Sequence, residues 1–217
     1  MFEKLKKNKL MVILLCVIVL FNGTAAFASN TDIERINPNN YPRDSRERYV
    51  ASIALQKDIT YEEADKLEKQ ELARYGLDEQ GFVLFSNDEY LRYKTIDKRA
   101  GRIQDGSIYN QDVYIATEVR YVWNRVYNKL VYIESIGGPY VYIPGASNVS
   151  ITGGDMVVEK YANNARISRT CSFVYQTSGG SVTVGGDIIS FTKNWAGVTI
   201  TTRAKTVSIS ITESDLR

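Results

Sequence analysis

Residues 109–213 consist of short stretches in which apolar and polar side chains alternate, separated by turns that contain glycine or asparagine. The last stretch places Val207, Ile209 and Ile211 on one face and hydroxyl side chains on the other. This alternation is typical of half-buried strands, because successive side chains of a strand point to opposite sides. The spacing of the turns predicts about seven to nine short strands in an antiparallel β-sandwich-like domain, in preference to a small barrel.

The stretch from residue 113 to residue 123 shows the alternation most clearly. One set of alternate side chains is apolar and suits a core: Val113, Ile115, Thr117, Val119, Tyr121 and Trp123. The other set is mixed in polarity and compatible with solvent: Tyr114, Ala116, Glu118, Arg120 and Val122. We therefore predict that Tyr121 and Trp123 are core residues and that Tyr114 is exposed.

Some aromatic residues are left over once this core is accounted for. They are Tyr114, Tyr132, Tyr140, Tyr142 and Trp195. Tyrosine is a favourable strand residue, so packing within the sheet is one explanation for them. A loop tryptophan beside exposed tyrosines also forms sugar-binding surfaces and protein–protein patches. We take these five as candidate binding residues, with structural packing as the alternative.

The chain before the strands has helical signals. Residues 29–43, with two prolines and no apolar periodicity, predict a flexible leader. Residues 44–76 predict a helical hairpin, whose second helix begins at a capping box formed by Thr60 and Glu63. Residues 77–108 predict a linker or irregular segment. Helices followed by strands predict an α+β fold.

Charged side chains in this first half are explained by local roles. The second helix of the hairpin carries Glu62, Glu63, Asp65, Glu68 and Glu71. Each suits a cap, a helix-dipole partner or an ion pair, so we predict a solvated helix surface, not a catalytic or metal site. The pair Lys98-Arg99 suits a protease cut site or a solvated loop.

The N-terminus has the three parts of a secretory signal. A lysine-rich start precedes the uncharged apolar residues 10–21, and Ala26-Phe27-Ala28 fits the small-x-small cleavage pattern. A helix of this apolar length rises about 18 Å, short of the roughly 30 Å hydrocarbon core of a bilayer. We predict a signal peptide over residues 1–28, cleaved after Ala28. The protein is then secreted and meets the membrane only during export, with a retained anchor as the alternative.

Missing residue types exclude several chemistries. The chain has no histidine, which removes Ser-His-Asp and Cys-His catalysis and histidine-ligated zinc. Cys171 is the one thiol outside the predicted signal, and we expect it to be buried. Removing the signal takes four lysines and one glutamate from 27 basic and 25 acidic residues, which leaves 23 and 24. We therefore predict no nucleic-acid partner, no metal and no cofactor.

Three functions remain in view. The first is a secreted, non-enzymatic binding or interaction protein of the bacterial envelope or extracellular space, with cell-wall glycan or an envelope protein as partner. The second is a secreted membrane-active or antagonistic protein. The third is a glycan hydrolase that uses paired carboxylates. Its candidate acids are Asp112, Glu118, Glu134, Asp155, Glu159 and Asp187.

The overall organisation resembles that of small secreted proteins of Gram-positive bacteria. An export signal, a short charged helical region and a β domain rich in Ser, Thr, Gly and Tyr follow one another. This resemblance is one of composition and implies an extracellular location without assigning any site residue.

Overall fold

The computed structural model describes residues 36–74, 76, 88–104, 110–177, 184–194 and 197–217. Its helices are η1 Pro38–Asn40, α2 Arg46–Lys57, α3 Tyr61–Arg74 and α4 Glu213–Leu216. Its strands are β1 Glu89–Gln104, β2 Asn110–Asn124, β3 Lys129–Tyr142, β4 Ser147–Thr152, β5 Val157–Lys160, β6 Ala165–Thr177, β7 Ile188–Asn194, β8 Gly197–Thr202 and β9 Lys205–Ile211. The pairings between these strands are antiparallel. The predicted α+β class with antiparallel sheets is therefore confirmed.

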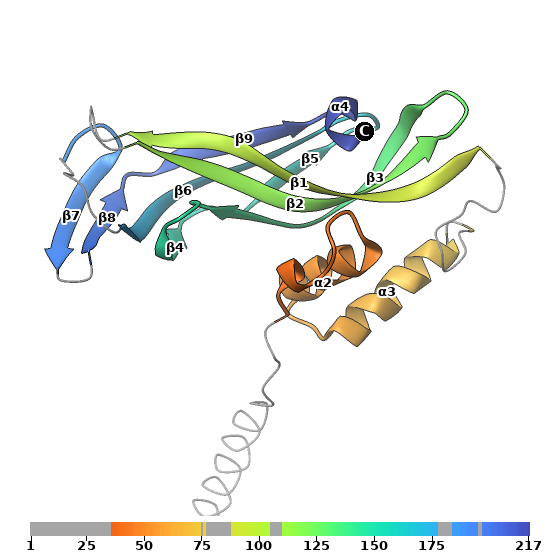
Figure 1. Ribbon diagram of the computed structural model, residues 1–217, viewed down its shortest axis with the longest axis horizontal. Coiled ribbons are helices and arrows are strands. Elements are labelled where there is room, and N and C mark those ends of the chain that lie inside the picture. The colour runs from red at the N-terminus through yellow and green to blue at the C-terminus, as the bar shows by residue number, and fades with distance from the viewer. Residues whose placement is uncertain (1–35, 75, 77–87, 105–109, 178–183, 195–196) are drawn as a thin grey trace, which may run out of the picture. The chain divides into compact units, whose positions relative to one another are not determined.

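Two sheets form the β part (Figure 1). The first has the strand order β1-β2-β3, with β2 in the centre. The second has the order β4-β6-β8-β7, and β6 also pairs with β5 and β9. Strand β6 reaches all of these partners because it is long: its first residues pair with β5 and β9 and its last with β4 and β8.

The hydrophobic core draws buried side chains from both sheets. Strand β2 contributes the predicted apolar face, including Tyr121 and Trp123, which are 0% and 2% exposed. Buried residues of β6, β8 and β9 belong to the same core, and Cys171 is among them, as expected. The hydroxyl of Tyr121 donates a hydrogen bond to the backbone oxygen of Leu216 at 2.6 Å, so the end of the chain is held against the core.

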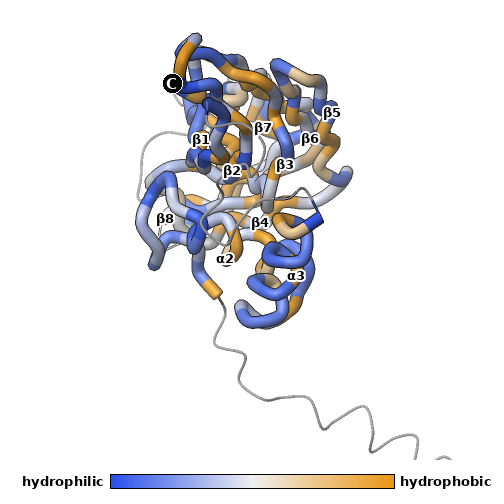
Figure 2. Tube along the Cα trace, turned by 90° about the vertical axis from the view of Figure 1, so that its right-hand side faces the viewer, coloured by the Kyte–Doolittle hydropathy of each residue, from blue (hydrophilic) through white to orange (hydrophobic). Residues whose placement is uncertain are grey.

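Helices α2 and α3 lie on one side of the β1-β2-β3 sheet (Figure 1). Ser45 caps α2 by accepting a hydrogen bond from the amide of Arg48. The predicted capping box of α3 is confirmed: the Thr60 amide donates to Glu63 and the Glu63 amide donates to the Thr60 hydroxyl. In Figure 2 the tube of α3 is mainly hydrophilic in colour, which agrees with the five acidic residues expected there.

The expectation of a linker or irregular segment is wrong for residues 89–104. These residues form β1, which pairs with β2 along nearly its whole length. The polar composition of these residues resembles that of a loop, but their charged side chains have partners on β2 and α4. Arg99 pairs with Asp112 of β2 at 2.9 Å, and Lys98 pairs with Asp215 at 2.9 Å. Both residues of the suggested cut site therefore lie within a paired strand.

Gly137 and Gly138 lie within a strand, although glycines mark turns elsewhere in this part of the sequence. Strand β3 passes through them, and helix α2 packs closely against them. Gly138 has a φ of +51°, and a Cβ there would lie 2.7 Å from the backbone oxygen of Ser52. Glycine is required at this position because α2 approaches the backbone of β3 directly.

Candidate binding surface

The face of β2 that was expected to be compatible with solvent is largely buried. Ala116, Glu118, Arg120 and Val122 are each less than 5% exposed, because α2 and α3 cover this part of the sheet. Tyr114, at the start of the strand, is partly exposed. The same face of the sheet therefore has a part covered by helices and a more open part that carries tyrosines.

Three of the five candidate aromatics come together on the open part. Tyr114 of β2 is paired in register with Tyr142 of β3, and their ring centroids are 5.8 Å apart with planes tilted by 37°. Tyr140 and Tyr142 are also 5.8 Å apart, with planes tilted by 38°. We call Tyr114, Tyr140 and Tyr142 the tyrosine row. Tyr140 is 37% exposed and the other two are partly exposed, so the row is accessible from outside.

Polar groups hold the tyrosine row in place. The hydroxyl of Tyr142 donates to both carboxylate oxygens of Asp97 on β1, at 2.8 and 2.9 Å. Burial and the neighbouring Asp97 both raise the pKa of Tyr142, so its hydroxyl remains a proton donor at neutral pH. Burial likewise raises the pKa of Tyr140, and the neighbouring side chain of Asn39 acts in the opposite direction.

The other predicted site residues lie elsewhere or outside the described part of the chain. Tyr132 is 38% exposed, but it lies far from Tyr140 along the sheet. Its partner on β2 is Val122, whereas the partner of Tyr140 is Ala116, six residues away. That separation is roughly 20 Å along a strand, so Tyr132 is not part of the row. Trp195 and the predicted cleavage residues Ala26 and Ala28 lie outside the described residues.

A buried ion pair lies farther along the same face of β2, where α2 covers the sheet. The Nε of Arg48 on α2 donates to Glu118 of β2 at 2.7 Å, and the hydroxyl of Thr95 donates to the other carboxylate oxygen at 2.7 Å. Arg48 also donates to Asn39 at 2.8 Å, which links this pair to Tyr140. Burial raises the pKa of Glu118, against the lowering effect of its bonds to Arg48 and Thr95. Sequence reasoning did not identify this network.

A second buried group, which we call the Arg120 cluster, joins α3 to the sheet. Arg120, 1% exposed, forms ion pairs with Glu68 and Glu71 of α3 and with Glu134 of β3. The guanidinium also lies 5.3 Å from the ring centroid of Tyr49 on α2. Burial opposes the charge of Arg120, but Tyr49, Glu68 and Glu134 outweigh it and raise the pKa of the guanidinium.

The Arg120 cluster corrects the prediction that the acidic residues of the second helix are all solvated. Glu68 is 5% exposed, and it accepts a hydrogen bond from the Tyr93 hydroxyl at 2.9 Å. A sequence signal was present: Ala64, Glu68 and Leu72 are spaced by four residues and lie on one helix face. An acid within an apolar stripe indicates a buried partner of opposite charge, and that partner is Arg120.

The six acids of the hydrolase hypothesis are either ion-paired with basic side chains or exposed. Four of them, Asp112, Glu118, Glu134 and Asp187, are in ion pairs with arginine or lysine. The other two, Asp155 and Glu159, are exposed. The bond to Arg102 lowers the pKa of Asp112. Burial opposes the charge of Asp187, but its bond to Lys205 outweighs burial and lowers the pKa. Both carboxylates are therefore ionised and paired with a basic side chain. Among the described residues, no group of three acidic or thiol side chains is placed to hold a metal ion.

Comparisons with known proteins identify no relative from which a function could be inferred. The chain matches no family model, no curated protein and no solved structure. In the part of the chain that the structure describes, no helix has the length and apolar character needed to cross a membrane.

Proposed function

We propose that this protein is a secreted, non-enzymatic binding protein of the bacterial envelope or extracellular space, and that the tyrosine row contacts cell-wall glycan. The observation that carries this proposal is the row itself. Tyr114, Tyr140 and Tyr142 come from two strands, lie ring beside ring, and stand next to the carboxylate of Asp97.

The chemistry of the row suits a carbohydrate. Tyrosine combines an apolar ring with a polar hydroxyl, so it can pack on the C–H face of a sugar and also hydrogen-bond to it. The carboxylate of Asp97 can accept hydrogen bonds from sugar hydroxyls. Arg99 is paired with Tyr114 across the sheet, and its exposed guanidinium can donate hydrogen bonds to the same ligand. A chain that is nearly neutral after the predicted cleavage has no strong field of its own, so binding rests on these short-range contacts.

The rest of the chain supports the proposal in two ways. We propose that the two sheets pack as a β-sandwich, which is a rigid scaffold for a surface built on strands. We also propose that residues 1–28 direct export and are removed after Ala28, which brings the row to the cell wall.

The experiment is co-sedimentation with insoluble cell wall that has been stripped of protein. The protein is expressed from its full sequence in a bacterial host, and wild type is compared with a Tyr114→Ala, Tyr140→Ala double variant. Tyr127→Ala is the matched control, because Tyr127 is 72% exposed but lies in the turn between β2 and β3. We expect wild type and control to pellet and the double variant to stay in solution.

Two other outcomes reject the glycan. If wild type pellets only with walls that retain their proteins, the partner is an envelope protein. If wild type does not pellet with either material, the tyrosine row packs the sheet and has no wall ligand. Raising the salt concentration should leave true glycan binding largely unchanged, because stacking and neutral hydrogen bonds are weakly screened.

A further inference from the structure

A pocket of about 190 Å³ lies between α2, α3 and β3, apart from the tyrosine row. Its lining consists of Tyr49, Ile53, Gln56, Lys57, Ala64, Leu67, Glu68, Glu71, Ser135 and Ile136. Cavities of about 150 Å³ in other proteins hold a benzene molecule, so this pocket has room for a small organic ligand.

The pocket runs from the surface to buried polar atoms. At its mouth, Leu67 is 41% exposed and the side chain of Glu71 is 52% exposed. At its floor, Tyr49 is 1% exposed, and its hydroxyl donates to Ser135 at 2.9 Å. This pocket is open to solvent and has polar groups that a ligand can contact, as ligand-binding sites do. An apolar packing defect has no such groups.

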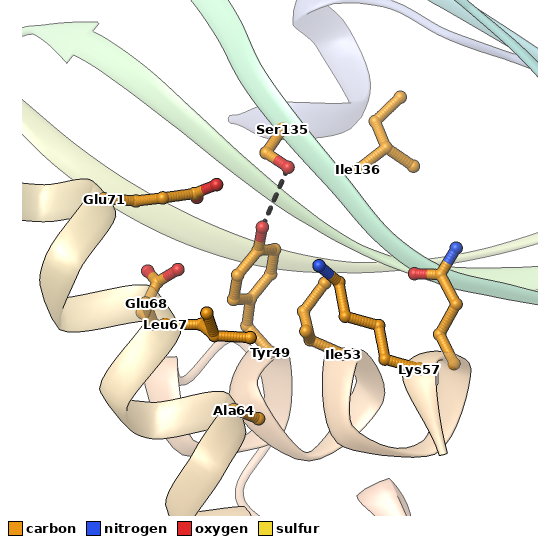
Figure 3. A pocket seen from close by; sticks show the side chains of 10 residues that line it. Tyr49, Ile53, Lys57, Ala64, Leu67, Glu68, Glu71, Ser135 and Ile136 are labelled. Carbon is orange, nitrogen blue, oxygen red and sulfur yellow. Dashed lines mark hydrogen bonds between the residues drawn. The ribbon is translucent and has the colours of Figure 1, made fainter. Parts of the chain in front are cut away.

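The two sides of the pocket carry opposite charge. Figure 3 shows Glu68 and Glu71 extending from α3 on one side of Tyr49, with Lys57 and Ile53 of α2 on the other. Arg120 binds both carboxylates from behind and fixes their positions. The Arg120 cluster has three carboxylates for one guanidinium, so its side of the pocket keeps a net negative charge. The ammonium of Lys57 makes the opposite side positive.

Apolar side chains make up much of the remaining lining of the pocket. Ile53, Ala64, Leu67 and Ile136 line the pocket from all three elements. A ligand that satisfies every surface has an ammonium group, a carboxylate and a short apolar part in one small molecule.

We propose that this pocket binds a small zwitterion of the α-amino acid type with an aliphatic side chain. The ligand ammonium meets Glu71 and Glu68, the ligand carboxylate meets Lys57, and the aliphatic part packs on Ile53 and Leu67. Placing each charge opposite a group of the other sign gives specificity, because a ligand that lacks one charge leaves a group of the pocket unpaired. This site is independent of the tyrosine row and of the function proposed for it.

The test is calorimetric titration of the full chain with three matched probes. L-leucine carries both charges, 3-methylbutylamine lacks the carboxylate, and 4-methylpentanoate lacks the ammonium group. We expect leucine to bind with a Kd of about 1 mM or tighter, and each single-charge probe to bind at least about tenfold more weakly.

Two variants assign the charges to the two sides of the pocket. Glu71→Gln should weaken leucine and the amine but leave the acid unchanged, whereas Lys57→Met should weaken leucine and the acid but leave the amine unchanged. Both residues are at the surface, so the variants should fold as wild type does. Lys69→Met is the matched control, because Lys69 is an exposed lysine of α3 that does not line the pocket.

The proposal is overturned if leucine does not bind at concentrations well above 1 mM. It is also overturned if the amine binds as tightly as leucine, since the positive side of the pocket then has no role. Equal loss of leucine binding in the Lys69→Met control would place the ligand elsewhere on α3.

Discussion

Strand β2 has an apolar face, which belongs to the core shared with the second sheet, and a charged face, which α2 and α3 cover. Over residues 115–124 both faces are withdrawn from water. Arg120 and Tyr121 are neighbours in sequence, point in opposite directions, and are 1% and 0% exposed. On one side, burial removes apolar surface from water, which is favourable without requiring a particular partner. On the other side, burial removes charge from water, which is costly unless each charge meets its partner.

The difference explains why the two faces have different coverings. Apolar side chains of β6, β8 and β9 lie over the first face and form one continuous core with it. The second face is covered by elements that supply opposite charge at fixed positions: Arg48 from α2 meets Glu118, and Glu68 from α3 meets Arg120. We expect the apolar face to supply most of the stability and the charged face to fix where the helices dock.

The largest effect should come from Arg120→Met. This change removes one guanidinium and leaves the buried carboxylate of Glu68 and the partly buried carboxylate of Glu134 without a counter-charge. We expect the free energy of unfolding to fall by about 3–5 kcal/mol, as measured by urea denaturation at neutral pH. Arg125→Met is the control, because Arg125 is an exposed arginine of the turn after β2 and should change stability by less than about 0.5 kcal/mol.

A triple variant separates the cost of an unpaired charge from the worth of the cluster. Combining Arg120→Met with Glu68→Leu and Glu134→Leu removes the buried charges together, and most of the lost stability should return. If the triple variant is as unstable as Arg120→Met, the cluster itself stabilises the fold and the proposed contrast between the two faces is wrong.

The apolar face of the same strand should respond more mildly to a small truncation. Ile115 is fully buried in the core, and Ile115→Val removes one methylene group without exposing a charge. We expect a loss of about 0.5–1.5 kcal/mol, measured by the same denaturation. The loss should be independent of pH between acid and neutral conditions, and a clear pH dependence would show that the two faces are coupled through the backbone of β2.

Neutralising Glu118 should have a smaller effect of opposite sign. Burial raises the pKa of Glu118 above its ordinary value of 4.5. A carboxyl with a raised pKa contributes stability that is present below that ordinary value and is lost as the pH rises through the folded-state pKa. Glu118→Gln removes this loss, and the amide oxygen of the new side chain can still accept the hydrogen bond from Arg48, so the guanidinium is not left without a partner. The variant should therefore match wild type in acid and be slightly more stable at neutral pH.

Thermal unfolding followed across this pH range checks the sign. If Glu118→Gln is instead less stable than wild type at neutral pH and recovers in acid, then the ion pair with Arg48 outweighs the cost of burying the carboxylate. The charged face would then stabilise the fold as well as position α2.

Alternation along β2 was enough to predict the apolar face, because a row of apolar side chains on one side of a strand is stable only when a core covers it. Tyr121 and Trp123 were predicted as core residues, and they are. The charged face was not predictable from the strand, since its burial depends on α2 and α3, which lie about fifty residues or more earlier in the chain. A local pattern reports side-chain polarity and does not report which element will cover it.

The candidate site was predictable to a similar extent. Tyr140 and Tyr142 are two residues apart and therefore share a face of a strand, but their meeting with Tyr114 depends on the register between β2 and β3. That register contains shifts at several positions, which sequence alone does not reveal. Strand β1 was missed because its charged residues resemble a loop until their partners on β2 and α4 are known.

The smallest effect should come from an exposed charge pair on α3, which tests whether burial is what separates the charged face from ordinary surface charge. Lys69 pairs with Asp65 at 2.9 Å, four residues earlier on the same helix, and its side chain is 49% exposed. Lys69→Ala should lower the free energy of unfolding by about 0.3–0.5 kcal/mol, and moderate salt should remove the difference. Arg120→Met should keep its much larger effect in the same salt, because a buried charge is poorly screened. If salt reduces both effects equally, the Arg120 cluster is solvated in solution, and its charges position α3 no more firmly than a surface pair does.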